Sequence, residues 1–139
     1  MEIVTNHVED ILIAAGRIVG VIGTVNHRYA GRTVPASNTT PEPPQLAALF
    51  SDMRGAGVEM AIMEVSSHAL ALSRVAGCLF TGAVFTNLSR DHMDFHENVE
   101  DYLAAKCRLF SDYLDAKNPG AFAAIRPACP IGITGSASP

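Results

Sequence analysis

Apolar residues recur along this chain with two alternating patterns, one typical of helices and one typical of buried strands. Helical spacing is clear near the N-terminus, where it stops at Gly16, a residue type suited to a helix C-terminus. Short apolar runs rich in β-branched residues predict strands buried on both faces. The expected helices cover residues 5–15, 45–54 and 99–114, and the expected strands cover residues 18–22, 58–65 and 79–86. The alternation predicts an α/β fold, with a mostly parallel sheet flanked by helices.

Two other segments complete the predicted outline of the domain. The sequence around Ala30 and Gly31 predicts the turn of a small hairpin, and the proline-rich residues 35–44 predict a loop before the second helix. Residues 118–139 have weak periodicity and several prolines. We therefore expect one domain over residues 1–117, followed by an aberrant or disordered tail over residues 118–139.

Composition removes several classes of function. With 139 residues, 48% of them hydrophobic and 17% charged, the chain suits one globular domain. Its formal net charge of -4 leaves no basic stripe for nucleic acid or an anionic membrane, so neither partner is expected. Three widely spaced cysteines, no leader pattern and no long apolar run favour a cytoplasmic protein without membrane insertion.

Polar residues follow the second predicted strand, where ligands of a parallel sheet bind. Glu64 ends this strand and is either a Mg²⁺ ligand or a carboxylate that caps the following helix. Ser66, Ser67 and His68 come next, but the GxSxG pattern of serine hydrolases is absent. Helix capping by a serine explains them more simply than catalysis does.

A second polar group follows the third predicted strand and includes Asp91, His92, Asp94 and His96. Histidine and carboxylates bind divalent metals, which makes His92 a candidate ligand. The competing interpretation is structural, because Asn98 with nearby acidic residues is a good helix start.

Lys106 is unusual because it lies within the expected apolar stripe of the last helix, with Val99, Leu103 and Phe110. Burial without a partner would favour its neutral amine. The alternative is a side chain whose amine reaches the solvent at the rim of the core.

No GxxxxGK[ST] loop is present. Five segments nevertheless resemble, in order, those of the Mur ligases, the ATP-dependent amino-acid ligases of bacterial cell-wall synthesis. The match is to the central, P-loop-type domain of the branch that adds the third residue of the stem peptide. The matching segments are GVIGTV (residues 20–25), NTTPE (38–42), MEVSSHAL (63–70), FTNLSRDHMDFH (85–96) and YLAAKCRLF (102–110).

The resemblance implies a reaction and a set of site residues. Family members use ATP to phosphorylate the terminal carboxylate of UDP-N-acetylmuramoyl-L-alanyl-D-glutamate, and an amino acid then attacks to form an amide. Full-length members are expected to be monomeric. Glu64, His92 and Lys106 would serve the Mg²⁺ site, with Lys106 catalytic as a carbamate. The residues implied to contact the UDP-muramoyl dipeptide are Asn38, Thr39, Thr40, Ser66 and Arg74.

The chain also departs from the family pattern. The phosphate-binding loop expected before residue 5 is missing, and Leu72 replaces a glutamine that helps hold the substrate. We therefore expect an incomplete domain that is inactive alone, and the choice between meso-diaminopimelate and L-lysine stays open. The alternatives are a related ligase, such as a folylpolyglutamate or cyanophycin synthetase, and a non-catalytic remnant. The NTTP segment argues against the related ligases.

Overall fold

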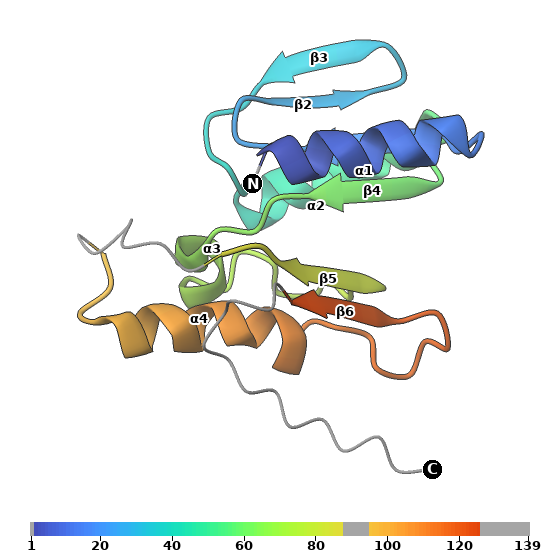
Figure 1. Ribbon diagram of the computed structural model, residues 1–139. Helices are drawn as coiled ribbons and strands as arrows, with labels where there is room; N and C mark the ends of the chain where they lie inside the picture. The colour runs from blue at the N-terminus through green and yellow to red at the C-terminus, as the bar shows by residue number, and fades with distance from the viewer. Residues whose placement is uncertain (1, 88–94, 126–139) are drawn as a thin grey trace.

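The computed structural model describes residues 2–87 and 95–125, and the following account concerns those residues (Figure 1). Helices and strands alternate through most of their length, as the sequence pattern predicts. The elements in chain order are α1 (Glu2–Ala14), β1 (Val19–Ile22), β2 (Asn26–Tyr29), β3 (Arg32–Pro35), α2 (Pro43–Gly55), β4 (Met60–Met63), α3 (Ser67–Ala71), β5 (Gly82–Phe85), α4 (Val99–Ser111) and β6 (Phe122–Ile125).

The larger sheet has four strands in the order β3-β2-β1-β4. Strands β1 and β4 are parallel, with Val19 opposite Met60 and Ile22 opposite Met63. Strands β2 and β3 form the expected hairpin and add two antiparallel pairs to the sheet. Ala30 and Gly31 both have positive φ, at 49° and 75°, which is the turn conformation that matches the twist of a two-residue hairpin. The predicted parallel arrangement is therefore present in β1 and β4 and is extended by a hairpin.

Strands β5 and β6 form a second, parallel ladder, with Gly82 opposite Phe122. The chain reaches β6 through residues beyond α4, and a bridge between Phe80 and Leu114 begins the pairing. Strand β6 lies within the residues that the sequence analysis assigned to the tail. Its sequence carries little sign of a strand, because the alanines at its centre have weak strand propensity.

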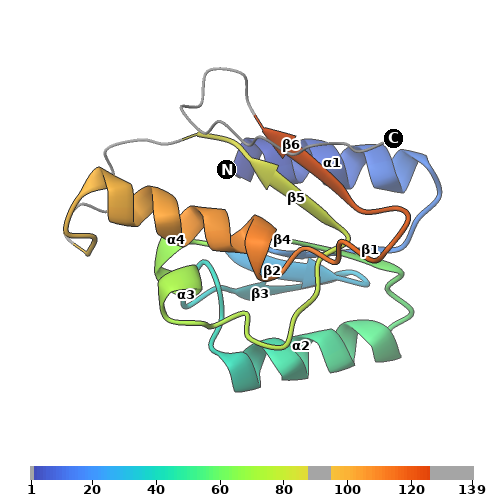
Figure 2. The same ribbon diagram turned by 90° about the horizontal axis from the view of Figure 1, so that it is seen from below.

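Helices cover both faces of the larger sheet, with α1 on one side and α2 on the other (Figure 2). Helix α2 contributes Leu46 and Met53 to the core, where they meet Ile22 and Tyr29. The contact with β1 is close, because a Cβ atom built on Gly20 would lie 2.8 Å from the Met53 sulfur. Glycine at this position therefore allows α2 to sit directly on the strand.

The expected helices are confirmed, but the buried face of α4 differs from the predicted stripe. Tyr102 and Ala105 are its buried residues, whereas Val99 is 42% exposed. The prediction that Val99 lies in the core is wrong, because α4 buries the face that carries Tyr102 and Ala105. None of the helices in residues 2–87 and 95–125 is both long and apolar enough to cross a membrane.

The buried His27 of β2 should make stability depend on pH. Burial lowers the pKa of its imidazole below the usual 6.5, against a smaller opposing effect of a hydrogen bond with the Asn26 backbone. The unfolded chain therefore binds a proton near pH 6.5, while the folded chain does so only at lower pH. Stability should fall as the pH is lowered through this window.

We predict that His27→Val reduces this acid sensitivity, since valine suits a strand position opposite Ile22 and Val34. Urea unfolding at pH 7.5 and 5.5 would measure the free-energy difference in each variant. His7→Gln, at an exposed position of α1, is the control and should keep the wild-type difference. An unchanged difference in His27→Val would contradict the prediction.

Candidate functional site

Glu64 lies at the carboxyl end of β4, as the sequence analysis expected. Its backbone N–H donates to the Ile22 carbonyl at 2.9 Å, which continues the pairing with β1 by one residue. Thr24 follows β1 at the same edge, because parallel strands end on the same side. The Thr24 hydroxyl donates to Glu64 Oε2 at 2.5 Å. Parallel pairing thus brings these two side chains together.

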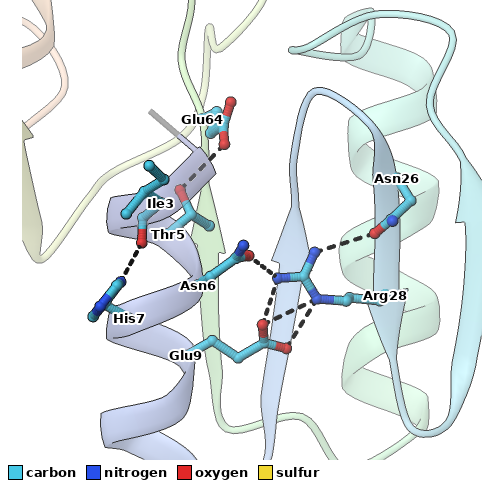
Figure 3. Close-up of polar contacts among 8 residues, drawn as sticks. All are labelled: Ile3, Thr5, Asn6, His7, Glu9, Asn26, Arg28 and Glu64. Atoms are coloured by element: carbon cyan, nitrogen blue, oxygen red, sulfur yellow. Dashed lines mark hydrogen bonds and ion pairs between the residues drawn. The ribbon is translucent and has the colours of Figure 1, made fainter.

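The Glu64 carboxylate is buried, with 3% of the residue exposed. Its other oxygen accepts a hydrogen bond from the Thr5 hydroxyl of α1 at 3.3 Å (Figure 3). Among the described residues, no lysine, arginine or histidine forms an ion pair with Glu64. A buried carboxylate held by neutral hydroxyls retains oxygen lone pairs that a cation can bind.

This donor set fits magnesium. Mg²⁺ prefers oxygen ligands and commonly binds one or two protein carboxylates together with phosphate oxygens and water. Residues 2–87 and 95–125 contain no group of three or more histidine, cysteine or acidic side chains placed to hold a metal. A magnesium ion that is also bound by a phosphate ligand needs only one or two protein carboxylates, and Glu64 can serve as one.

Helix α1 is held in place by Arg28 of β2 (Figure 3). The Arg28 Nε donates to both carboxylate oxygens of Glu9, at 3.1 and 3.0 Å, and a terminal nitrogen donates to the same group. Arg28 also donates to Asn6 at 2.7 Å and to Asn26 at 3.1 Å. These bonds tie the helix to the hairpin and so place Thr5 beside Glu64.

The NTTP segment packs against the end of β4 through Thr40. This residue is fully buried, and its hydroxyl donates to the Glu64 carbonyl at 3.0 Å and accepts from the Ser66 N–H at 3.1 Å. The hydroxyl thus uses both its donor and its acceptor in bonds to the backbone. Thr40 therefore positions the NTTP segment against the end of β4. Asn38 is exposed and Thr39 is half-buried, which leaves these two open to a ligand.

Ser66 and Arg74 lie beside this segment. Ser66 caps α3 by accepting a hydrogen bond from the Ala69 N–H at 3.1 Å, which confirms the capping interpretation. Arg74 pairs with Glu42 at 2.8 Å and donates to the Thr40 carbonyl at 3.4 Å. Its Nε is buried and makes no hydrogen bond within the described part of the chain. Ser66 and Arg74 therefore both contact Thr40, which Asn38 and Thr39 precede in the chain.

Lys106 lies on the side of α4 that faces β5. Its amine donates to the Asn87 carbonyl at 3.1 Å and lies over the rings of Tyr102 and Phe85, at 4.9 and 5.3 Å from their centroids. The residue is half-buried. Aromatic faces and a carbonyl oxygen therefore surround the amine, in place of the apolar stripe expected from the sequence.

Two cavities border this region. A small one of about 20 Å³ is lined by Val65 and Lys106. Val65 follows Glu64 in the chain, so Glu64 and Lys106 both lie near the ends of β4 and β5. A larger open cavity of about 590 Å³ lies between the first turn of α1 and the ends of β5 and β6. Its volume is within the range of ligand sites, and it lies where α/β sheets bind ligands.

Sequence reasoning left part of this site out. It did not find Thr5, because the contact between α1 and the end of β4 is visible only in three dimensions. It also missed a buried hydrogen bond between Ser67 and His96 at 2.9 Å. The candidate ligand His92, with Asp91 and Asp94, falls outside the described residues.

Comparison with known proteins identifies the origin of this arrangement. Residues 4–125 match the Mur ligase middle domain. The chain belongs to the Mur ligase family. This agrees with the resemblance found in the sequence and with the α/β fold.

Relatives narrow the branch of Mur ligases that the chain resembles. It is 56% identical over 99 residues to the UDP-N-acetylmuramoyl-L-alanyl-D-glutamate–2,6-diaminopimelate ligase of Corynebacterium glutamicum, a match that covers 71% of this chain and 19% of that protein. The ligase of the same name from Bacillus velezensis is 50% identical over 107 residues, covering 77% and 22%. The chain thus spans about a fifth of the length of these two relatives.

A solved structure of a ligase with this name is also similar. It superimposes with a TM-score of 0.78 and 28% sequence identity, over 91% of this chain and 24% of the other. The Mur ligase fold assigned from the sequence is therefore supported by shape as well as by residue identity.

The buried Thr40 hydroxyl provides a test of the site's framework. Thr40→Val keeps the shape but leaves the Glu64 carbonyl and the Ser66 N–H without their partner. We expect a loss of about 1–3 kcal/mol in the free energy of unfolding, measured with urea. Thr39→Val is the matched control and should change stability by less than about 0.5 kcal/mol. Equal effects of the two substitutions would refute the positioning role.

Proposed function

We propose that this domain serves an ATP-dependent ligase that joins 2,6-diaminopimelate to UDP-N-acetylmuramoyl-L-alanyl-D-glutamate in peptidoglycan synthesis. In this reaction ATP phosphorylates the terminal carboxylate of the dipeptide. The amine of the incoming amino acid then attacks the acyl phosphate, which forms the amide and releases phosphate. The names of the similar ligases support the choice of diaminopimelate over lysine.

The observation that carries the proposal is the environment of Glu64 in a Mur ligase middle domain. The carboxylate is buried at the strand ends, receives hydrogen bonds from Thr5 and Thr24, and has no cationic partner among the described residues. Magnesium bound there would offset the charge of the phosphoryl oxygens. Thr5 and Thr24 orient the carboxylate for this purpose.

We assign the contacts with the UDP-muramoyl dipeptide to the segment around Thr40. Asn38 is exposed and Thr39 is half-buried, and Arg74 is attached to the same segment through the Thr40 carbonyl and Glu42. Ser66 contacts Thr40 and lies two residues after Glu64 in the chain. The buried Thr40 attaches this segment to the end of β4 through its hydrogen bonds with the Glu64 carbonyl and the Ser66 N–H. Because ATP and a nucleotide-linked substrate are required, we place the reaction in the cytoplasm.

Lys106 has two possible roles in this reaction. As a carbamate it would supply oxygen ligands for magnesium together with Glu64, and His92 would complete the protein ligands. As an ammonium ion, in contact with the Asn87 carbonyl and the rings of Tyr102 and Phe85, it would instead bind phosphate oxygens. We propose the carbamate, because Lys106 matches the lysine that is carbamylated in the Mur ligases that the chain resembles.

The ligase activity can be tested in a chimaera, in which residues 4–125 replace the matching segment of the Corynebacterium glutamicum ligase. We expect ADP release that requires both the UDP-muramoyl dipeptide and diaminopimelate. Glu64→Gln should lower kcat by about 100-fold or more while the chimaera remains folded. Thr39→Val should mainly raise the KM for the dipeptide.

A folded chimaera without activity would favour the non-catalytic remnant over the ligase. Activity with another amino-acid acceptor in place of the UDP-muramoyl dipeptide would favour one of the related ligases. Lysine used in preference to diaminopimelate would overturn the choice of amino acid alone.

Substitutions at Lys106 in the same chimaera distinguish its two roles. If the carbamate is required, Lys106→Ala abolishes turnover, added formate or acetate restores part of it, and Lys106→Arg stays inactive. If the ammonium acts directly, Lys106→Arg retains part of the activity and small carboxylates have no effect. The measurement is kcat for ADP release, with the melting temperature as a check on folding.

A further inference from the structure

Ser67 and His96 form a buried polar contact that the proposed reaction does not use. The Ser67 hydroxyl and His96 Nε2 are 2.9 Å apart, and the residues are 2% and 6% exposed. Ser67 begins α3 just after Glu64, and His96 precedes the Asn98 cap of α4. The bond therefore joins the segment that follows β4 to the start of the helix that carries Lys106.

The His96 ring is fixed by aromatic neighbours as well as by Ser67. Its centroid lies 5.1 Å from that of Tyr102 and 5.0 Å from that of Phe95, which stacks on His68 at 3.9 Å. Tyr102 in turn lies under the Lys106 amine at 4.9 Å. A continuous path of contacts thus runs from Ser67 through His96 and Tyr102 to Lys106.

A second connection between α3 and α4 lies beyond Lys106. Arg108 donates to the Leu70 carbonyl at 2.6 Å and to the Ser73 hydroxyl at 3.5 Å. Lys106 therefore lies between two points at which its helix is attached to α3. These polar contacts add to the packing of the buried Tyr102 and Ala105 in fixing the orientation of α4.

We propose that Ser67 and His96 are positioning residues, which set the placement of Lys106 at the ends of β4 and β5. They act through α4 and Tyr102 and do not contact the substrate. The importance of that placement rests on the proposed function, but the placement itself can be measured without catalysis.

The sequence offers an internal reference for this measurement, because its lysines are Lys106 and Lys117. Lys117 is exposed, whereas Lys106 is half-buried and hydrogen-bonded to Asn87. Brief acetylation of the 139-residue chain with acetic anhydride, followed by mass spectrometry of peptides, gives the ratio of modification at the two amines. We expect a low ratio of Lys106 to Lys117 in the unchanged chain.

Ser67→Ala and His96→Phe should each raise this ratio several-fold, because α4 loses one attachment. Ser67→Thr keeps the hydroxyl, and His96→Gln places an amide nitrogen near the position of Nε2, so both should retain a low ratio. Leu46→Ala is the control for general destabilisation, since Leu46 belongs to the core contributed by α2. It should lower the melting temperature and leave the ratio unchanged.

The proposal is overturned if Ser67→Ala and His96→Phe keep the low ratio while folded, or if Leu46→Ala raises it equally. It is also overturned if the ratio is already high in the unchanged chain. None of these results depends on whether Lys106 is a carbamate or on whether the chimaera makes an amide bond, so the two proposals can fail separately.

Discussion

The parallel pairing of β1 with β4 determines where the chemistry of this domain lies. Because both strands end at the same edge, Thr24 and Glu64 become neighbours although they are far apart in the chain. The Thr40 hydroxyl bonds to the backbone on both sides of Val65, and so attaches the NTTP segment to the same edge. Without this register, neither the carboxylate nor the NTTP segment would lie at the ends of the strands.

The parts of the fold that sequence could predict are those with a strong local signal. Apolar runs of β-branched residues indicated β1, β4 and β5, and Asn98 indicated the start of α4, where its side chain accepts from the Asp101 N–H at 2.8 Å. Strand β6 had a weaker signal, since two of its four residues are alanine and it is stabilised by pairing with β5. Contacts between distant segments, such as Thr5 with Glu64, leave no periodic pattern to detect.

Lys106 shows how the same limit affects a candidate site residue. The sequence singled out its position on α4, but its surroundings differ from those expected. Its surroundings are aromatic rings and a carbonyl rather than an aliphatic core, and they come from β5 as well as from its own helix. Helical periodicity describes one element, whereas the chemical state of an amine depends on every element that packs against it.

The absence of a side chain at Gly20 has a mechanical consequence for the NTTP segment. Helix α2 rests on Gly20 through Met53 near its C-terminal end, and residues 38–42 lead into its N-terminal end. A helix of 13 residues is about 20 Å long and nearly rigid, so it behaves as a lever. A side chain at Gly20 would have to displace the Met53 thioether or move α2, and a movement of α2 would disturb the NTTP segment at the other end of the helix. Mutation of this distant strand residue is thereby coupled to the segment that we propose binds the dipeptide.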